Sequence, residues 1–171
     1  MASNPSIPRV ATAADADDVG RLLHDFNTEF DTPSPGREVL ARRLRALLAR
    51  PETFAVVAGA PPIAVALVTL RPNVWYEGPV ALLDELYVVP ELRSQGIGAS
   101  VIGLVVSTCE QRGVERIEIN VDEPDVDAQR FYERHGFSAI EPGTTDRALY
   151  YARELLPRGD QPPDTLGVRP S

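Results

Sequence analysis

The segment ELRSQGIGAS, residues 91–100, places an arginine and two glycines directly before an apolar stretch that has the pattern of a helix. Glycine-rich turns before helices bind phosphate groups, because backbone N–H groups at a helix N-terminus point toward the same anion. A P-loop needs a lysine and then Ser or Thr after its last glycine, whereas Ala99 and Ser100 follow Gly98 here. A dinucleotide-binding turn needs a third small residue, and Val101 stands in that place. A plain turn between a strand and a helix remains as the alternative.

The composition restricts the classes of protein to which the chain can belong. Its 171 residues suit one domain with a sizeable core. The formal net charge of -8 argues against a nucleic-acid partner and is compatible with a cationic small substrate, although most acidic proteins are simply soluble. The single cysteine, Cys109, excludes an internal disulfide, and the two histidines form no metal-binding pattern with it. Because neither a signal peptide nor an apolar run of membrane-spanning length is seen, we expect a cytoplasmic protein without membrane association.

The hydrophobic pattern predicts an α/β (α+β) domain with a mixed sheet, because strands and helices do not alternate strictly. The predicted strands cover residues 7–11, 53–58, 63–70, 80–89, 116–121, 137–140 and 147–153. The predicted helices begin at Thr12 and at Ser34 and cover 98–112 and 126–135. Thr12 forms a short capping box with Asp15. The second helix carries an apolar stripe of Leu40, Leu44, Leu47 and Leu48. We expect one domain over residues 1–156, followed by a flexible tail over 157–171 that is rich in Pro, Gly and Asp.

Two blocks of sequence together carry a family resemblance. The segment LDELYVVPELRSQGIG resembles the signature of the GNAT superfamily of acyl-CoA-dependent N-acetyltransferases, in which Arg or Gln precedes a Gly and then a Gly or Ala. Arg93, Gly96 and Gly98 match this signature, and DVDAQRFYERHGF, residues 125–137, is similar to a second block of the family. The resemblance implies a mostly antiparallel sheet of six to seven strands flanked by four helices. It also implies direct transfer of an acetyl group from acetyl-CoA to an amine.

The resemblance implies a coenzyme A site around the opening segment. Backbone N–H groups from Ser94 to Ala99 can surround the pyrophosphate of the coenzyme. The expected cofactor-binding residues are Leu86, Tyr87, Val88, Arg93, Ser94, Gln95, Gly96, Ile97, Gly98, Ala99, Asp125, Ala128, Tyr132 and Arg134. Asp125 replaces an asparagine that usually opens the second block. Because Asp and Asn cap helices about equally well, the helix should still begin there.

The implied chemistry needs a base, an acid and a donor to the acyl oxygen. Tyr132 matches the tyrosine of the family that protonates the leaving thiolate. Glu85 and Asp84 are the candidates for the base, with Glu85 preferred, and water without a dedicated base is the alternative. Neighbouring strand residues point to opposite faces, so only one of the two carboxylates faces the acceptor unless a bulge interrupts the strand. A backbone N–H near Tyr87 or Val88 would bind the acyl oxygen.

The resemblance also indicates which segments shape the acceptor pocket. In this family the first two helices and the loop before the signature strand shape the acceptor pocket, and in this chain they carry acidic and aromatic groups that suit a cation. The expected substrate residues are Phe26, Glu29, Trp75 and Tyr76. A small, cationic primary amine is therefore the preferred acceptor. The alternatives are a protein lysine or N-terminus, and an acyl-CoA-binding module without turnover. Because dimers are common in the family, a homodimer is also expected.

Overall fold

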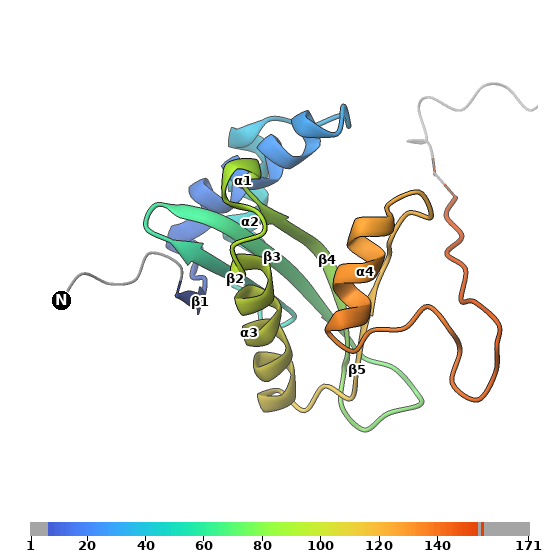
Figure 1. The fold of residues 1–171 in the computed structure, drawn as a ribbon. Coiled ribbons are helices and arrows are strands. Elements are labelled where there is room, and N and C mark those ends of the chain that lie inside the picture. The colour runs from blue at the N-terminus through green and yellow to red at the C-terminus, as the bar shows by residue number, and fades with distance from the viewer. Residues whose placement is uncertain (1–6, 154, 156–171) are drawn as a thin grey trace, which may run out of the picture. The chain divides into compact units, whose positions relative to one another are not determined.

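The computed structural model describes residues 7–153 and residue 155. The described residues divide into two compact units, one ending at Phe137 and the other beginning at Ser138. The first unit contains the sheet and all the helices of the described chain (Figure 1). The predicted tail over 157–171 lies outside the described residues, and the domain boundaries stay a prediction.

The sheet of the first unit has five strands in the order in which they occur along the chain. They are β1 (Pro8–Val10), β2 (Thr53–Gly59), β3 (Pro62–Arg71), β4 (Val80–Val88) and β5 (Arg116–Ile119). The first four strands pair antiparallel, and β5 pairs parallel to β4. The sheet is therefore mixed and mostly antiparallel, which confirms the predicted fold class.

Four α-helices cover the two faces of the sheet in the described chain. They are α1 (Ala16–Glu29), α2 (Arg37–Leu47), α3 (Ile97–Gln111) and α4 (Val126–Arg134), and two short 3-10 helices occupy Ala13–Asp15 and Pro90–Leu92. Helices α1 and α2 pack on one face, and α3 and α4 pack on the other (Figure 1). The predicted number of α-helices is confirmed.

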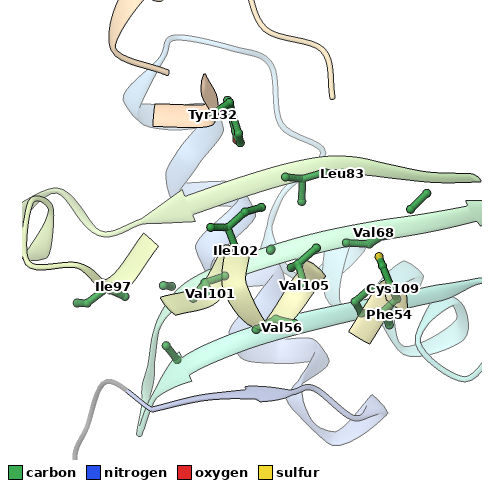
Figure 2. Close-up of a cluster of buried hydrophobic side chains, with 14 residues drawn as sticks. Phe54, Val56, Val68, Leu83, Ile97, Val101, Ile102, Val105, Cys109 and Tyr132 are labelled. Carbon is green, nitrogen blue, oxygen red and sulfur yellow. The ribbon is translucent and has the colours of Figure 1, made fainter. Parts of the chain in front are cut away.

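The central strands are buried on both faces, because each face is covered by helices. Alternate residues of β2 face opposite cores. Val56 packs with Val101 and Val105 of α3 (Figure 2), whereas Val57 packs on the side of α1 and α2. This period of two explains why the segments 53–58 and 63–70 read as nearly continuous apolar runs.

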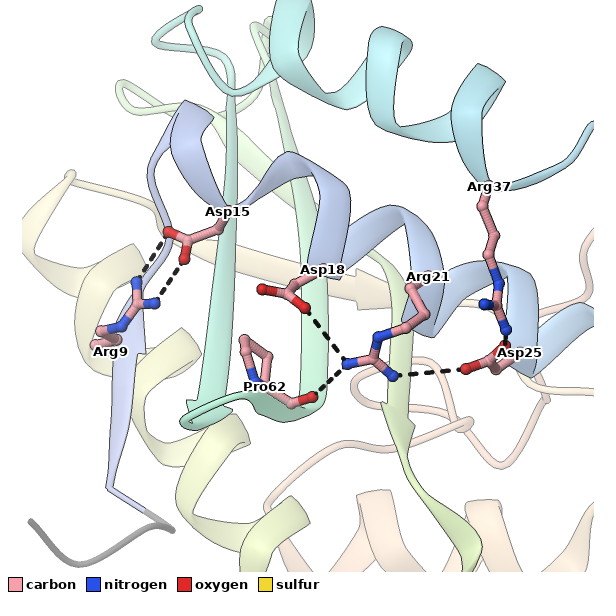
Figure 3. A network of polar contacts seen from close by, with 7 residues as sticks. All are labelled: Arg9, Asp15, Asp18, Arg21, Asp25, Arg37 and Pro62. Atoms are coloured by element: carbon pink, nitrogen blue, oxygen red, sulfur yellow. Dashed lines mark hydrogen bonds and ion pairs between the residues drawn. The ribbon is translucent and has the colours of Figure 1, made fainter.

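The 3-10 helix Ala13–Asp15, which leads into α1, begins with the predicted capping pattern. The carboxylate of Asp15 accepts hydrogen bonds from the backbone N–H and the hydroxyl of Thr12, at 2.7 and 3.1 Å. Arg9 of β1 pairs with the same carboxylate at 2.6 Å (Figure 3). Further along α1, Arg21 donates to the carbonyl of Pro62 at 2.7 Å. These contacts hold the polar side of α1 against β1 and the turn between β2 and β3.

The second helix begins later than the sequence predicts. Its N-cap is Gly36, with φ of 95°, so α2 starts at Arg37 instead of at the Ser34–Pro35 step. The hydroxyl of Ser34 instead accepts from the N–H of Gly36 at 3.2 Å and lies 2.8 Å from Nδ1 of His24. The buried stripe of α2 contains Ala41 and Leu44, while Leu40 and Leu48 pack at its margin and Leu47 is exposed. The prediction was wrong for Leu47.

The prediction of six to seven strands was also wrong, because the described residues form five. The predicted strands 137–140 and 147–153 are reduced to a single antiparallel bridge between Ile140 and Arg147 in the second unit. The N–H of Ala148 donates to the carbonyl of Ala139 at 2.9 Å, just beside this bridge. A two-stranded ribbon this short buries too little apolar surface to extend further by itself.

Gly20→Ala tests the close approach of α1 and α2. A Cβ at Gly20 would lie 2.9 Å from the backbone nitrogen of Ala41, so the helices would have to move apart. We expect urea unfolding to show a loss of about 1–3 kcal/mol in the free energy of unfolding. The control is Gly103→Ala on α3, where no described atom lies within 4 Å of the new Cβ. That change should stabilise the protein by up to about 1 kcal/mol, and a similar gain at Gly20 would contradict the close contact.

Candidate active site

A β-bulge in β4 decides where the two candidate carboxylates point. Leu67 of β3 pairs with Glu85, and the next residue, Val68, pairs with Leu83, so Asp84 is an extra residue in β4. Leu83 faces the α3 side of the sheet, whereas Glu85 pairs with a residue whose side chain packs on the α1 side. The alternation predicted for an unbroken strand therefore fails here, because a bulge re-aims the residues that follow it.

Both carboxylates lie on the α1 side of the sheet as a result. Asp84 accepts a hydrogen bond from the hydroxyl of Thr69 at 2.6 Å. Thr69 is two residues from Leu67 on β3, so the two share a face. The bulge that the prediction named as its exception is thus present, and both carboxylates share one face of the sheet.

Burial raises the pKa of the Glu85 carboxyl above its usual range, and the negative charge of Asp84 raises it further. Burial also raises the pKa of Asp84, while the hydrogen bond from Thr69 opposes this shift. Asp84 nevertheless keeps an exposed side chain, whereas Glu85 is half-buried. No described residue forms a hydrogen bond or ion pair with Glu85. Glu85 therefore has the properties of a base, with a raised pKa and free lone pairs.

The outer edge of β4 is open beyond the bulge. Strand β5 pairs with β4 only from Val80 to Leu83, so the part of β4 that follows has no strand partner on that side within the described chain. The N–H of Val89 donates to Ile63 of β3 at 3.0 Å. Because successive N–H groups of a strand point to opposite edges, the N–H of Val88 points to the open edge. Of the two predicted donors to an acyl oxygen, Tyr87 and Val88, the geometry favours Val88.

The glycine turn before α3 and the first residues of this helix carry free backbone donors. Within the described chain, none of the N–H groups from Ser94 to Ala99 donates to a protein acceptor. Ser94 and Gly96 have φ of 61° and 79°, both left-handed, and Gly96 is the N-cap of α3. Alternation of such residues with ordinary ones turns successive N–H groups inward and forms a concave anion-binding surface. The predicted phosphate-binding residues Ser94, Gln95, Gly96, Ile97, Gly98 and Ala99 all belong to this turn.

The first turn of α3 lies beside α4 at Gly98. A Cβ at this position would lie 3.4 Å from the ring of Phe131. Asp125 caps α4 by accepting the N–H of Ala128 at 2.9 Å, which confirms the predicted helix start. Leu86 and Ala128 are partly buried on this side of the sheet, and Arg134 is exposed in the last turn of α4. The contact brings the second sequence block beside the first.

Tyr132 of α4 belongs to the same buried cluster as the α3 residues and lies near β4 in Figure 2. Its ring contacts Phe131 and Phe137 with centroid distances of 5.2 and 5.6 Å. Burial raises the pKa of the phenol well above its usual range, and the charges of Asp125 and Glu85 add to the shift. No described residue accepts from the hydroxyl, and no buried side-chain polar atom of the described chain lacks a partner, so the hydroxyl reaches solvent. Tyr132 thus holds its proton at neutral pH at an accessible point.

The structure divides the four predicted substrate residues between two places. Phe26 of α1 packs against Tyr87 with ring centroids 5.3 Å apart, and Glu29 pairs with Arg93 at 2.7 Å. Trp75, 86% exposed, lies with Tyr76 in the loop that precedes β4. This loop approaches the C-terminal end of α3, where Gly78 lies against the carbonyl of Gly113. The two groups lie at opposite ends of β4, a strand of roughly 26 Å at about 3.3 Å per residue.

The comparison with protein families agrees with this geometry. The sequence model of the Acetyltransferase (GNAT) family matches residues 17–137, which include the bulge, the glycine turn before α3 and α4. The chain belongs to the GNAT family of acetyltransferases. It is therefore an acyl-transferring enzyme by family. None of the curated protein sequences matches this GNAT chain.

Solved structures support the same fold. A candidate acetyltransferase from Arthrobacter sp. FB24 is 48% identical, with a TM-score of 0.84 over 91% of this chain and 99% of the other. An aminoglycoside acetyltransferase from an uncultured soil metagenomic sample, in complex with sisomicin, is 18% identical, with a TM-score of 0.71 over 87% and 95%. A ribosomal-protein-alanine N-acetyltransferase from Brucella melitensis biovar Abortus 2308 is 18% identical, with a TM-score of 0.67 over 86% and 98%. The two distant structures show the fold of this GNAT chain and nothing about its acceptor.

One residue of the GNAT site, Thr69, and one contact, between Glu29 and Arg93, were not predicted from the sequence. Thr69 orients Asp84, and nothing near Thr69 in the sequence marks it, because the register of β3 and β4 creates the contact. Glu29 was expected to bind substrate, and its pairing with Arg93 spans 64 residues.

Among the described residues, none of the helices combines the length and the apolar character that a membrane span requires.

Glu85→Gln should stabilise the fold at neutral and alkaline pH. The pKa of Glu85 is raised in the folded state, so the folded protein binds this proton more tightly than the unfolded chain does. Stability of the wild type therefore falls as pH rises from about 4.3, the ordinary Glu pKa, through the folded value. The glutamine variant lacks this loss.

The measurement is urea unfolding of both proteins at several pH values between 4 and 9. We expect the free energy of unfolding of the variant to increase relative to that of the wild type as the pH rises, and the difference then to stay constant. The same substitution at Glu38, exposed on α2, controls for the general effect of removing one carboxylate. If the wild type instead becomes more stable relative to Glu85→Gln as the pH rises, the fold stabilises the charged carboxylate and the prediction is wrong.

Proposed function

We propose that this chain is an N-acetyltransferase that moves an acetyl group from acetyl-CoA directly to a primary amine of a small cationic molecule. The observation that carries the proposal is the juxtaposition of two features at the end of β4. One is the turn from Ser94 to Ala99, with its unpartnered N–H groups. The other is the open strand edge that begins beyond the bulge at Asp84.

The residues present fit coenzyme A. The turn supplies N–H groups at the N-terminus of a 15-residue helix, where the helix dipole also favours phosphate. The open edge of β4 supplies backbone groups that suit the amides in the arm of the coenzyme. Arg134, exposed at the end of α4, can add positive charge. The arrangement accounts for both the charged and the extended part of the cofactor.

Three groups of the chain fit the proton transfers and the charge of such a reaction. Acetyl-CoA supplies the acetyl group as a thioester. Glu85, with its raised pKa and free carboxylate, takes a proton from the acceptor ammonium. The N–H of Val88 donates to the acyl oxygen as negative charge develops there. Tyr132, which keeps its proton at neutral pH, gives it to the leaving sulfur. Base and acid lie on opposite faces of β4, so amine and thiol do not compete for one space.

The charge on the α1 side of the sheet favours a cationic acceptor. Asp84 and Glu85 have no cationic partner among the described residues. In contrast, Asp25 pairs with Arg37 at 2.6 Å (Figure 3), and Glu29 pairs with Arg93 at 2.7 Å. Two uncompensated carboxylates attract an amine and hold it as the ammonium ion until the base accepts its proton. The sisomicin complex of the distant aminoglycoside acetyltransferase makes polycationic amines the first acceptors to test.

Gly96→Ala tests the phosphate-binding turn. Alanine at φ of 79° costs about 1–2 kcal/mol of strain and distorts the N–H groups of the turn. We expect calorimetry to show at least tenfold weaker binding of acetyl-CoA. Gly113→Ala is the matched control, since this glycine has φ of 71° and lies beyond the other end of the same helix. It should lose similar stability and keep the wild-type affinity. No binding to the wild-type protein would refute the proposed function.

Tyr132→Phe tests the assignment of the acid. Loss of the hydroxyl should lower kcat by about 10²-fold or more, the usual contribution of a positioned acid. Affinity for acetyl-CoA should change by less than about threefold, because the ring keeps its packing. Free thiol release measures turnover, and calorimetry measures affinity. Turnover equal to that of the wild type would remove Tyr132 from the mechanism.

An acceptor screen separates the three functional hypotheses. Polyamines, aminoglycosides and lysine or N-terminal peptides are offered with acetyl-CoA, and free thiol is measured. The chain contains no lysine, so an acetyl-lysine signal must come from the acceptor and never from the enzyme. Transfer to polycationic amines supports the proposal. Transfer only to peptides indicates a protein acetyltransferase, and cofactor binding without any transfer indicates a binding module.

A further inference from the structure

Arg93 of the GNAT signature is held by a cluster of side chains at the end of β4. Its two terminal nitrogens donate to the two carboxylate oxygens of Glu29, both at 2.7 Å. Its Nε donates to the carbonyl of Val88 at 2.9 Å. The guanidinium lies 5.5 Å from the ring centre of Tyr87. Burial raises the pKa of Tyr87, and the Glu29 carboxylate, which lies near the Tyr87 hydroxyl, helps to raise this pKa. All three nitrogens of Arg93 are therefore engaged within the protein.

This arrangement differs from the expected role of both charged residues. Arg93 was expected to add positive charge at the cofactor phosphates, and Glu29 to bind a cationic substrate. In the structure each neutralises the other through a bidentate pair, the strongest geometry for an arginine and a carboxylate. The pairing lowers the pKa of Glu29 and raises the pKa of Arg93, so both stay charged across the physiological range.

The cluster joins three parts of the proposed site. Glu29 is the last residue of α1 and leads into the segment 30–36 before α2. Val88 carries the N–H proposed to bind the acyl oxygen, and its carbonyl shares the same open edge of β4. Arg93 directly precedes the phosphate-binding turn. The guanidinium of Arg93 donates a hydrogen bond to the backbone carbonyl of Val88. This carbonyl would pair with β5 if β5 extended further along β4.

We infer that Glu29 and Arg93 are positioning residues. The pair fixes Val88 at the open edge and ties the end of α1 to the phosphate-binding turn. The end of α1, on the side proposed for the acceptor, and the turn proposed for the cofactor are thereby held in a fixed relative position. The inference rests on the proposed function, because its consequence is measured on acetyl transfer. It differs from a phosphate-binding role for Arg93, in which Glu29 would compete with the cofactor for the guanidinium.

The test compares Glu29→Gln, Arg93→Gln and the double variant with the wild type. The acceptor is spermidine, or sisomicin if spermidine is not acetylated. We expect each single variant to lower kcat/KM for the acceptor at least tenfold, while the Kd of acetyl-CoA changes less than threefold. The double variant should be no worse than the worse single variant, because both residues act through one contact.

Arg45→Gln is the matched control. It removes an arginine of α2 from another exposed ion pair, which it forms with Asp17 of α1 at 3.0 Å, and the variant should keep wild-type kinetics. If Arg93→Gln weakens acetyl-CoA binding more than tenfold and Glu29→Gln strengthens it, Arg93 is a phosphate ligand and the inference is wrong. The inference is also wrong if the losses of kcat/KM in the two single variants add up in the double variant, or if all three variants have the kinetics of Arg45→Gln.

Failure of the proposed function gives a different result. If the wild-type protein transfers acetyl to neither amine, the proposed function fails, and with it the positioning role. The contact itself is then judged from urea unfolding of the same variants. A double variant that unfolds at the same midpoint as the worse single variant shows that the pair joins α1 to the turn, and additive shifts show that it does not.

Discussion

One extra residue in β4 is the constraint on which the site depends. Asp84 has no counterpart on β3, so the pairing of the two strands shifts by one position. The shift turns Glu85 toward the α1 side, and parallel pairing with β5 ends at Leu83, directly before the bulge. The carboxylate proposed as the base and the open edge proposed for the cofactor thus arise from the same irregularity. Bulges at functional sites commonly re-aim a side chain and end strand pairing together.

The second feature is the sorting of charges around that edge. Arginines neutralise Asp25 and Glu29 and thereby hold α1 to α2 and to the phosphate-binding turn. Asp84 and Glu85 have no such partner in the described chain, and their pKa values are raised. The first set of charges fixes structure, whereas the second set remains available for a substrate. Composition alone, with its net charge of -8, could not make this distinction, because both sets contain the same residue types.

Prediction from the sequence succeeded where local chemistry decides. The capping box at Thr12, the helix start at Asp125 and the turn before α3 depend on neighbouring residues, and all three are present. It failed where packing decides. The start of α2 moved to Arg37, and Leu47 points to solvent. The strands expected after Phe137 are limited to one bridge, because a β-pattern forms a strand only with a partner and a covered face.

The sequence by itself determined the family, the fold class and the place of the glycine turn before α3. These features depend on short motifs, whose glycines, caps and apolar periods act over a few residues. The tertiary structure alone decided which carboxylates are free and what Arg93 holds. Glu29 and Arg93 are 64 residues apart, and Thr69 and Asp84 are 15 apart. Contacts of this kind depend on strand register and helix docking, which result from burial of the whole core and are not encoded in any local pattern.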